Sequence, residues 1–373
     1  MTRLRVCIDA TPLLLRSAGV KTYIHHWLRA LALTAGGHRL EAFPWIGVLP
    51  PLDHQGSCYR LPGTGARLAA LLLANLKGSP ALNWIAGRSD VFHATNQVRN
   101  PPSNTRLTAT LHDLTCWVIP EVHTRANIHA DRRFAERVLR RADALIAVSE
   151  HTRCDAGRHL GIPLQRIEVI YSGIDPAFSS PAEHVIRDVR SRLGLGRPYI
   201  LFVGTIEPRK NVDAALDAYL SLSGSYRKEF EFVISGPRGW AAPHTFARLE
   251  TPPAGVRYLG YVSERDLPGL TAGATVFFYP SLYEGFGFPV AQAMAAGVPV
   301  VTSNVSALPE ITGGAALLVD PRSEEEMRNA LERILSATSL RVELAEAGRR
   351  RAAQFSWEDC ARRTWRFFER VAG

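Results

Sequence analysis

The stretch PSLYEGFGFPVAQAMAAGVPVVTS, from Pro280 to Ser303, holds a glycine-rich loop, a short helix and a strand in direct succession. Pro289 suits the first turn of a helix, where its missing N–H costs nothing, and Gly297 suits the left-handed residue at a helix end. The run VPVVTS is typical of a strand buried on both faces of a parallel sheet. We therefore expect this stretch to be one repeat of an α/β fold.

The loop at the start of this stretch also carries binding chemistry. Glu284 and Gln292 lie eight residues apart, with Gly285 and Gly287 between them. Free N–H groups at a helix N-terminus attract anions, and a carboxylate accepts hydrogen bonds from hydroxyls. The loop is thus suited to a ligand that is both anionic and rich in hydroxyls, such as a nucleotide-sugar.

Strand and helix patterns alternate along the whole chain. A helix is expected from Val20 to Leu33, among strands at RVCIDAT, DVFHAT, LTATLHD, ALIAVS and RIEVIYSGID. After a polar Pro/Ser-rich segment at 176–190 the alternation restarts, with strands at YILFVGT, FEFVISG, VRYLG, TVFFYPS and VPVVTS. Two successive arrays predict the α/β class, with two Rossmann-like doubly wound domains that face each other across a cleft. Ligands of such sheets bind at the carboxyl ends of the strands.

Domain limits follow from the restart of this pattern. We expect the first domain at residues 1–180, the second at 181–355 and a final helix at 356–373. Ser356 with Asp359 three residues later is a capping-box signal for the start of that helix. The helix, rich in aromatic residues, either closes the second domain or crosses back to the first.

Composition agrees with two cytoplasmic domains. The chain has 373 residues, 46% of them hydrophobic, which is long for a single core. Five scattered cysteines without a CxxC pair argue against a disulfide framework or a zinc site. The apolar run LAALLLA is too short to span a bilayer, and Asp9 interrupts the first apolar stretch too early for a secretory signal.

Positive charge is concentrated in the first half. The net charge is +9, and residues 1–180 hold 21 Lys and Arg against 13 Asp and Glu, a balance of +8. This half is suited to a phosphate-bearing acceptor or an anionic membrane surface, unless the charge is only a solvated surface. Nucleic acid is not expected as a partner, because no recognition module and no basic helix or tail is present.

A second segment, VGTIEPRKNVDAALDAYL (203–220), predicts a phosphate site. Arg209 and Lys210 precede Asn211, a candidate N-cap, and the helix that begins at Val212. The helix N-terminus favours anions, the arginine offers a bidentate fork and the lysine adds a point charge. The alternative is a solvated basic loop.

Both segments together resemble the family-4 retaining glycosyltransferases, whose two Rossmann-like domains form the GT-B fold. The matching pieces of the second half are GTIEPRKN, SLYEGFGFPVAQAMAAGVPVV and SNVSALPEITGGAALLVDP. The first half adds SAGVKTY, FHATN, TLHDL and AVSEHT. The resemblance covers almost the whole chain and is strongest from 199 to 321.

The resemblance implies roles for the matching positions. Arg209 and Lys210 would bind the donor diphosphate and stabilise it as the leaving group, and Glu284 would contact hydroxyls of the donor sugar. His112 would line the donor-sugar and acceptor site of the first, acceptor-binding domain, unless it forms only a polar pair with Asp113. Further donor contacts are expected from Gly19, Gly204, Thr205, Tyr261, Gly287, Phe288 and Gln292.

Two positions depart from the family pattern. Gln292 stands where a second glutamate usually holds the nucleotide ribose, which weakens that contact by on the order of 1 kcal/mol because the charge is lost. Thr205 stands where many relatives carry an arginine, so that Arg209 is expected to take more of the phosphate binding.

The chemistry implied by the resemblance needs no metal and no cofactor. Cations and helix dipoles stabilise the charge that develops on the departing diphosphate, and the sequence has no D-x-D or metal-spaced cluster. We expect a cytoplasmic enzyme, peripheral at the inner membrane face, that moves a hexose with retention of configuration to a glycan or polyprenyl-diphosphate-linked acceptor. GDP-mannose is the favoured donor, and UDP-hexoses and dTDP-rhamnose are alternatives. A nucleotide-sugar 2-epimerase or a non-catalytic nucleotide-sugar binder would share the fold.

Three other features have competing interpretations. His93 and Asn96 either shape a loop or contact the acceptor. The apolar stretch from Leu68 to Leu76 is expected to be core, with membrane contact as the alternative. The GTG at 63–65 lacks a preceding strand and is expected to be a loop.

Overall fold

The computed structural model describes residues 3–16, 19–45, 47–179 and 181–373. Ser17 and Ala18 of the SAGVKTY motif, and Ser180 of the expected linker, lie outside the described residues. Contacts divide the chain into two compact units: unit 1 comprises Met1–Pro120, Arg125–Gly173 and Ser356–Gly373, and unit 2 comprises Glu121–Thr124 and Ile174–Phe355.

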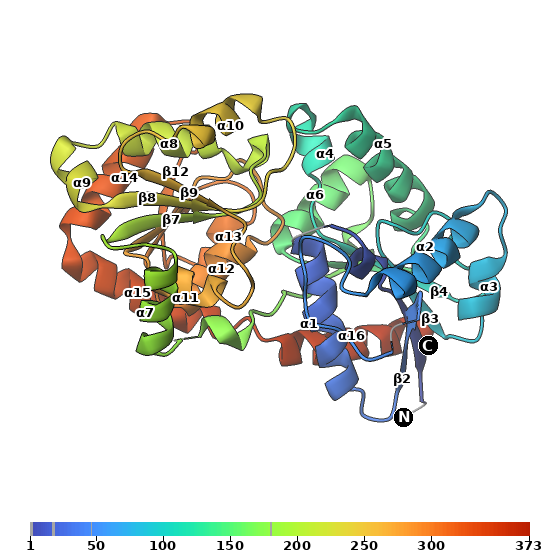
Figure 1. Ribbon diagram of the computed structural model, residues 1–373. Helices are drawn as coiled ribbons and strands as arrows, with labels where there is room; N and C mark the ends of the chain where they lie inside the picture. The colour runs from blue at the N-terminus through green and yellow to red at the C-terminus, as the bar shows by residue number, and fades with distance from the viewer. Residues whose placement is uncertain (1–2, 17–18, 46, 180) are drawn as a thin grey trace. The chain divides into compact units, whose positions relative to one another are not determined.

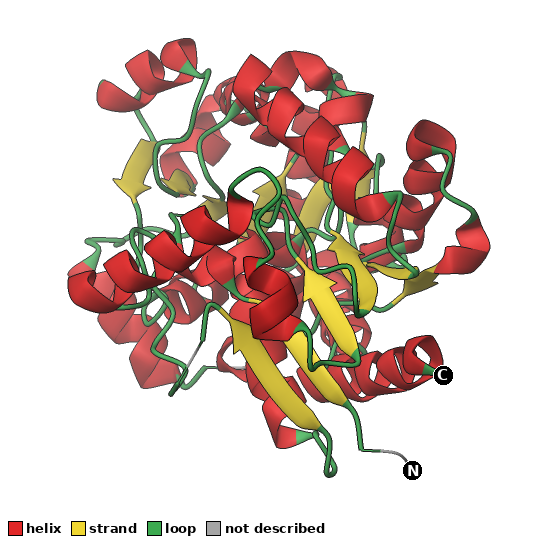
Figure 2. Cartoon of the chain, turned by 90° about the vertical axis from the view of Figure 1, so that its right-hand side faces the viewer, coloured by secondary structure: helices red, strands yellow, loops and turns green. Residues whose placement is uncertain are grey.

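Unit 1 is built on a six-stranded parallel sheet with the strand order β2-β1-β3-β4-β5-β6. Its strands are β1 (Arg5–Asp9), β2 (Arg39–Phe43), β3 (Val91–Ala94), β4 (Arg106–Leu111), β5 (Ala144–Ala147) and β6 (Ile167–Val169). Its α-helices are α1 (Gly19–Leu33), α2 (Leu61–Asn75), α3 (Ala81–Ala86), α4 (Thr115–Val118), α5 (Arg125–Phe134), α6 (Glu150–Leu160) and α16 (Trp357–Ala372). The yellow strands of this sheet and its flanking red helices are drawn in Figure 2.

Helices cover both faces of this sheet. Alternate strand residues, among them Cys7, Phe92 and Leu107, form one core with side chains of α2, α3 and α6. On the opposite face α1 and α16 pack together, and α16 also contacts β3 (Figure 1). Residues i and i+1 of a strand point to opposite faces, so neighbouring positions belong to different cores.

The final helix is part of unit 1. Ser356 is its N-cap and accepts a hydrogen bond from the N–H of Asp359. The indole of Trp27 on α1 donates to Thr364 on α16 at 3.1 Å, and the indole of Trp365 donates to the carbonyl of Leu31 at 3.2 Å. The C-terminal helix α16 thereby completes the core of the first unit.

Unit 2 repeats the architecture with the strand order β12-β11-β10-β7-β8-β9, again all parallel. Its strands are β7 (Tyr199–Val203), β8 (Glu231–Ser235), β9 (Val256–Gly260), β10 (Val276–Tyr279), β11 (Val300–Ser303) and β12 (Leu317–Val319). Its α-helices are α7 (Glu183–Arg192), α8 (Val212–Leu220), α9 (Gly224–Glu229), α10 (Pro243–Glu250), α11 (Leu267–Ala272), α12 (Phe288–Ala295), α13 (Leu308–Thr312), α14 (Glu324–Ser336) and α15 (Thr338–Ala352).

The helices of unit 2 again form two layers. The helix pair α8 and α14 covers one face of the sheet, while α7, α11, α12 and α15 cover the other (Figure 1). The strands between these layers are apolar on both faces, as β10 with the sequence VFFY illustrates, because no face of them meets water. Both units are doubly wound parallel α/β structures, which confirms the predicted fold class.

The boundary between the units differs slightly from the sequence-based limit. Contacts place it between Gly173 and Ile174, whereas the first domain was expected to end at residue 180. The N–H of Ile174 donates to the carbonyl of Phe355 at 3.0 Å, which ties the first residue of the main unit 2 segment to its last. The short segment 121–124 is also assigned to unit 2, which no pattern in the sequence indicates.

Candidate active site

The site of unit 2 begins with the pairing of two strands that are far apart in the sequence. β10 pairs directly with β7, with Val276 opposite Ile200. Both strands are parallel, so the loops that follow them leave the sheet at the same edge. The two loops are joined by a hydrogen bond of 2.8 Å from the N–H of Leu282 to the carbonyl of Arg209. The sheet topology therefore unites the PRKN and YEGFG segments.

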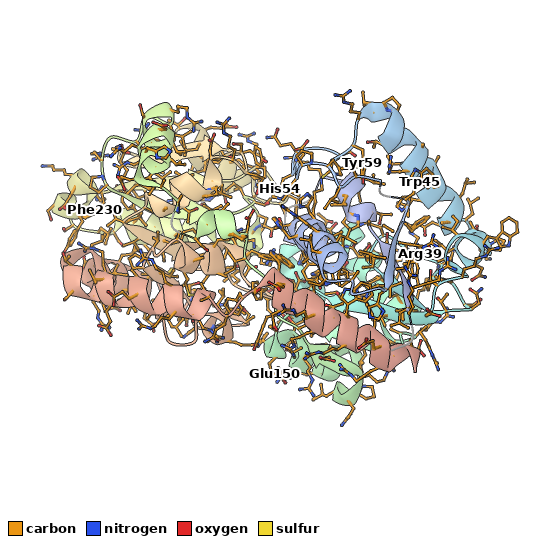
Figure 3. All side chains as sticks on the ribbon, turned by 90° about the horizontal axis from the view of Figure 1, so that it is seen from below. Arg39, Trp45, His54, Tyr59, Glu150 and Phe230 are labelled. Carbon is orange, nitrogen blue, oxygen red and sulfur yellow. The ribbon has the colours of Figure 1, made fainter. Side chains whose placement is uncertain are left out.

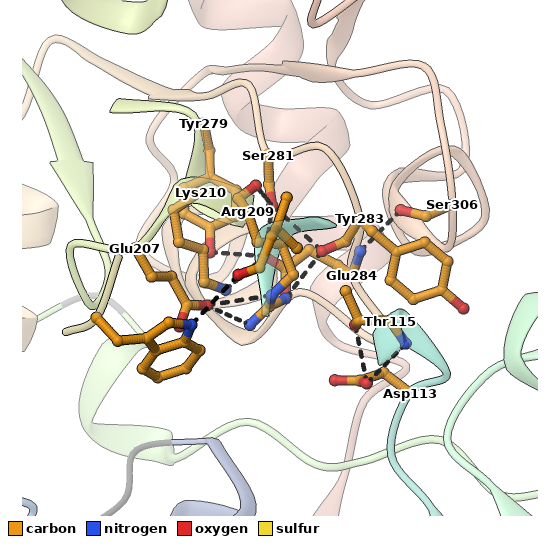
Figure 4. A network of polar contacts seen from close by, with 12 residues as sticks. Asp113, Thr115, Glu207, Arg209, Lys210, Tyr279, Ser281, Tyr283, Glu284 and Ser306 are labelled. Atoms are coloured by element: carbon orange, nitrogen blue, oxygen red, sulfur yellow. Dashed lines mark hydrogen bonds and ion pairs between the residues drawn. The ribbon is translucent and has the colours of Figure 1, made fainter. Parts of the chain in front are cut away.

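Glu284 is the centre of a buried polar cluster (Figure 4). Its Oε1 lies 2.5 Å from the ammonium of Lys210 and accepts hydrogen bonds from the hydroxyls of Tyr279, at 2.9 Å, and Ser281, at 2.8 Å. Its Oε2 lies 3.0 Å from the guanidinium of Arg209. Four side chains from two loops and one strand end thus hold a single carboxylate.

The charges around Glu284 keep it ionised. Burial would raise the pKa of its carboxyl, but the neighbouring Arg209 and Lys210 outweigh burial and lower the pKa to about 2. Burial also lowers the pKa of the Lys210 ammonium, as does the positive charge of Arg209, with the two nearby glutamates partly offsetting both effects. A buried charge of this kind is stable only while its partner is present.

Glu207 is a second carboxylate of this cluster. Its Oε1 lies 2.8 Å from Arg209, whose guanidinium also donates to the carbonyl of Tyr283 at 2.8 Å. Glu207 is itself buried, three residues before Lys210 in the loop after β7. Two cations and two carboxylates therefore balance within the cluster, which fixes both cations before any ligand is bound.

Asn211 has a different role from the predicted N-cap. It occupies the residue before α8, but its backbone is left-handed, with φ 60°, and its side chain makes no cap hydrogen bond. The amide instead donates to the carbonyls of Pro280, at 3.0 Å, and Pro321, at 2.7 Å. Asn211 thus ties the loop after β7 to two other loops at the same edge of the sheet.

Two loops approach each other closely at Gly236. A Cβ at Gly204, the first residue after β7, would meet only ordinary contacts at 3.5 Å or more. The constraint lies at Gly236, where φ is 153° and a Cβ would lie 1.8 Å from the carbonyl oxygen of Gly204. The sequence shows Gly236 only as a glycine after a strand, so its partner could not be anticipated.

The glycine-rich loop leads into α12 as predicted. Gly287 has φ 88° and precedes Phe288, the first residue of the helix, and a Cβ at Gly287 would lie 2.7 Å from Leu308. The N–H of Glu284 donates to the hydroxyl of Ser306 at 3.0 Å, which fixes the loop from its other side. The left-handed backbone favours glycine at position 287, and a side chain there would also displace the Leu308 methyl group.

The remaining donor-binding candidates of unit 2 lie at the same edge of the sheet. Thr205 follows β7, Tyr261 follows β9, and Gln292 lies one turn into α12. Gln292 is half-buried, and no described residue forms a hydrogen bond with its side-chain amide. The roles of these three residues in binding a donor stay predictions.

His112 and Gly19 belong to unit 1. His112 follows β4, and its ring lies 4.9 Å edge-on from Tyr23, which α1 carries one turn after Gly19. Burial lowers the pKa of the His112 imidazole to about 4, although Asp113 acts in the opposite direction, so the ring is neutral near pH 7. A Cβ at Gly19 would meet no described atom within 4 Å, and the role of Gly19 in binding a donor stays a prediction.

His93, a candidate acceptor contact, is a core residue. It lies on β3 with no exposed surface, and its two ring nitrogens lie 2.9 Å from the hydroxyls of Thr108 and Thr110. Its ring packs against Trp27 and Phe368, on the face covered by α1 and α16. Burial lowers its pKa to about 3. The acceptor-contact interpretation of His93 is therefore wrong, whereas Asn96 is exposed in the following loop.

Several residues of the cluster were not anticipated from the sequence. Tyr279 and Ser281 flank the end of β10, and Glu207 and Ser306 lie in loops of the same sheet edge. A polar residue at the carboxyl end of a buried strand was the available signal for Tyr279 and Ser281. No such signal marks Glu207 or Ser306, because their partners are set by loop conformation.

The described residues show neither a metal cluster nor a disulfide. Within them no group of three or more His, Cys, Asp and Glu side chains could hold a metal ion. All five cysteines are unpaired thiols. No described helix combines the length and apolar character needed to cross a membrane.

Comparisons with known proteins match both halves of the chain. Residues 17–178 match the model of Glycosyltransferase Family 4, and residues 187–351 match that of Glycosyl transferases group 1. The chain is 35% identical over 278 residues to the O-antigen chain mannosyltransferase B of Escherichia coli, covering 74% of this chain and 72% of that protein.

Two further similarities are weaker in coverage or identity. The serotype-specific mannosyltransferase WbdA of Escherichia coli is 29% identical over 59% of this chain, which spans only 28% of that protein. Among solved structures, a sucrose-phosphate synthase from Thermosynechococcus elongatus superposes with a TM-score of 0.73 and 20% identity, over 99% of each chain. The second similarity concerns the fold alone.

Proposed function

The chain belongs to the glycosyltransferases of group 1 and family 4, and we propose that it transfers mannose from GDP-mannose to a hydroxyl of a glycan or lipid-linked acceptor, with retention of configuration. The observation that carries this proposal is the buried cluster of Arg209, Lys210 and Glu284 at the carboxyl edge of the unit 2 sheet. The similarity to an O-antigen chain mannosyltransferase supports mannose as the sugar and surface polysaccharide as the product.

The proposed reaction breaks one bond and forms one at the anomeric carbon of the donor. The bond to the diphosphate oxygen breaks, and its electron pair leaves with the diphosphate. The acceptor oxygen forms the new bond on the face that the leaving group vacates. The acceptor proton passes to the departing diphosphate, so no side chain is assigned as a base.

Arg209 and Lys210 supply the charge stabilisation in this scheme. Both are held at the edge of the sheet by Glu284 and Glu207 before the donor arrives, so little reorganisation is needed during the reaction. One preorganised contact of this kind contributes about 3–4 kcal/mol to transition-state stabilisation. The diphosphate thereby becomes a better leaving group without a metal ion.

Glu284 has capacity for a sugar hydroxyl in addition to its protein partners. Among the described residues its Oε2 accepts from Arg209, and a carboxylate oxygen can accept a second hydrogen bond. The Oε1 is already occupied by Lys210, Tyr279 and Ser281. Glu284 would therefore contact the donor sugar through Oε2 while Oε1 keeps the lysine in place.

The acceptor is proposed to be a growing glycan on a polyprenyl diphosphate. The excess of basic residues in 1–180 is complementary to such a phosphate-bearing molecule and to the inner face of the membrane that would present it. UDP-hexoses and dTDP-rhamnose are the alternative donors. The 2-epimerase and the non-catalytic binder are the remaining alternatives.

A donor screen tests the proposal. Purified protein is titrated with GDP, UDP and dTDP while its melting temperature is followed, and is then incubated with radiolabelled GDP-mannose and a mannose-terminated lipid acceptor. We expect GDP to raise the melting temperature most and label to enter the acceptor. Stabilisation by UDP or dTDP alone would contradict GDP-mannose as the donor and favour a UDP-hexose or dTDP-rhamnose. Nucleotide binding without sugar transfer would favour a non-catalytic nucleotide-sugar binder.

Two additional measurements test the finer parts of the proposal. The anomeric configuration of the product is read from its one-bond carbon–proton coupling, and retention requires the α-linked sugar that the donor carries. Transfer in the presence of a chelator should proceed at an unchanged rate. Inversion, or loss of activity that Mg²⁺ restores, would contradict the respective assignment.

A further inference from the structure

The solvent-facing surface of α2 and α3 is apolar. The exposed fractions are 69% for Leu72, 59% for Leu73, 58% for Leu76, 82% for Trp84 and 47% for Ile85. We call these five residues the α2–α3 face. The two helices contact each other in unit 1 (Figure 1). The expectation that Leu68 to Leu76 would be core is thus wrong for Leu72, Leu73 and Leu76. Leu71 and Ala74 of the same stretch are buried, as expected.

The apolar character extends along one whole side of α2. Gly65, Ala66, Ala69, Leu72 and Leu73 are exposed at helical spacing, and none of them carries a charge. A surface helix ordinarily places charged or polar residues on the side opposite its core face. This helix buries one apolar side against the sheet and presents another to the solvent, a pattern that marks an interaction surface.

Hydrogen bonds hold the α2–α3 face in place. At the end of α2 the Asn75 side chain donates to the carbonyl of Gln97 at 2.9 Å, and Asn100 donates to the carbonyl of Leu76 at 2.8 Å. At α3 the Asn83 side chain accepts from the N–H of Ser103 at 2.8 Å. The apolar side chains are therefore presented by an anchored scaffold.

The charged residues of the segment that carries this face, between Asp53 and Asp90, all have one sign. Residues 54–89 contain no Asp or Glu, and they contain Arg60, Arg67, Lys77 and Arg88. Arg60, Lys77 and Arg88 are exposed. The guanidinium of Arg67 lies 3.9 Å from the ring centre of Tyr59 and 5.8 Å from that of Trp45, which extends the surface with two aromatic rings (Figure 3).

We propose that the α2–α3 face binds the surface of an anionic lipid bilayer. Leucines and a tryptophan can enter the boundary between headgroups and acyl chains, while the arginines and the lysine contact anionic headgroups. A second copy of the chain is a poorer occupant, because a symmetric contact would bring four basic residues of each copy together without any acid. The absence of acids across this whole segment is the charge complementarity that selects lipid.

This inference concerns unit 1 alone and does not rest on the proposed transfer reaction. Binding to vesicles requires neither donor nor acceptor, so the two proposals can fail separately. If vesicles bind and no sugar is transferred, only the proposed function fails. If sugar is transferred to a soluble acceptor and vesicles do not bind, only the membrane surface fails.

Vesicle sedimentation with the full chain is the experiment. Vesicles of phosphatidylcholine alone and of phosphatidylcholine with phosphatidylglycerol are compared at low and high salt. We expect binding to the anionic vesicles that weakens with salt. Leu72→Ala with Leu73→Ala should reduce partitioning at least about tenfold, because several buried CH₂ groups are lost, and Lys77→Gln about fivefold.

A second variant, Leu73→Glu, places a negative charge on the α2–α3 face, and Val342→Glu is its matched control. Val342 is 53% exposed on α15 of unit 2, so the two variants add the same charge at similarly exposed positions. Leu73→Glu should abolish vesicle binding, and Val342→Glu should leave it near the wild-type value. Equal effects of the two variants would overturn the proposal, as would a wild-type dimer in sedimentation velocity that Leu73→Glu dissociates without changing vesicle binding.

Discussion

The Glu284 cluster and the α2–α3 face reverse the ordinary distribution of polar and apolar residues in opposite ways. In unit 2 Glu207, Glu284 and Lys210 are each less than a tenth exposed, and Arg209 beside them is largely buried. In unit 1 leucines and a tryptophan are left in solvent. Each arrangement lowers the stability of the fold. The Glu284 cluster costs the desolvation of charged groups, and the α2–α3 face leaves apolar surface unburied.

The two sites depend on different interactions: ion pairing in the Glu284 cluster and exposed apolar side chains on the α2–α3 face. The Glu284 cluster depends on exact pairing, since removing one charge leaves another buried without a partner. The α2–α3 face has no pairing to lose, and single truncations there leave the fold unaffected. Substitutions should consequently affect activity and stability in the cluster, and only membrane binding on the face.

The largest effect is expected for Lys210→Ala. Loss of the ammonium that stabilises the departing diphosphate should lower kcat for sugar transfer by about 10²–10³-fold. Lys77→Ala is the matched control, because it removes an exposed lysine next to the α2–α3 face and should leave transfer to a soluble acceptor unchanged. Equal activities of the two variants, both folded by circular dichroism, would remove the functional side of the comparison.

Glu284→Gln is expected to have the next largest effect, on stability. The variant leaves Arg209 and Lys210 buried with one carboxylate fewer, which should cost about 3–5 kcal/mol of unfolding free energy. Glu250→Gln breaks the exposed pair of Glu250 with Arg238 and should cost less than about 1 kcal/mol. Urea unfolding measures both.

The same variant should change the pH dependence. The pKa of Glu284 falls from 4.5 to about 2 in the folded protein, so its stabilisation is fully present above pH 4.5. It is lost as the pH falls from 4.5 towards 2, because the unfolded chain then binds the proton more readily. A wild type and a Glu284→Gln variant with parallel stability curves in that range would contradict the ion-pair account.

Gly236→Ala sharpens the comparison by testing how the cluster loops are held. Its Cβ would lie 1.8 Å from the carbonyl oxygen of Gly204, and φ at this position is 153°, so a loss of about 1–3 kcal/mol is expected. Gly204→Ala, with nearest contacts at 3.5 Å, should cost less than about 1 kcal/mol. A tolerated Gly236→Ala would mean that the two loops are free to separate.

Gln292→Glu tests the ribose end of the same site. Restoring a carboxylate should tighten binding of the nucleoside diphosphate about fivefold, which corresponds to about 1 kcal/mol for a charge-assisted hydrogen bond. Isothermal titration with GDP measures the change, and Gln292→Ala provides the comparison in the opposite direction. An unchanged affinity in both variants would remove Gln292 from the donor site.

The smallest effect is expected for Leu72→Ala, within about 0.5 kcal/mol of the wild-type unfolding free energy. The preceding residue provides the control, because Leu71 is buried against the sheet and Leu71→Ala should cost about 2–5 kcal/mol. A large loss in Leu72→Ala would mean that this leucine supports the fold, and the α2–α3 face would no longer contrast with the cluster.

Much of the fold could be predicted from alternation alone. Every strand expected from a short apolar run is present, and the two arrays form two parallel sheets. The Pro289 and Gly297 signals marked α12 to within two residues, because they act through local backbone geometry. Asn211 occupies the predicted N-cap position but makes no capping hydrogen bond, because its amide donates to the carbonyls of Pro280 and Pro321, which lie far away in the sequence.

The histidines show the limit of the sequence more sharply. His93 and His112 both occur near strand ends, and both were candidates for the first-unit site. His93 lies within β3 and bonds to two threonines of β4, whereas His112 follows its strand and packs on Tyr23. Whether such a histidine lies inside the strand or just after it depends on where the strand ends. The sequence pattern does not fix that end to a single residue.

The two α/β arrays, the family and the two segments of the candidate site follow from the sequence, because periodicity and local motifs are encoded in consecutive residues. The tertiary structure alone placed Glu284 against both Lys210 and Arg209, since Lys210 and Glu284 lie 74 positions apart in the sequence and come together through the pairing of β10 with β7. It also decided that Leu71 is buried while Leu72 and Leu73 are exposed. The run from Leu68 to Ala74 is apolar throughout, so no polar residue within it indicates which side chains face the sheet, and the packing of the helix decides this.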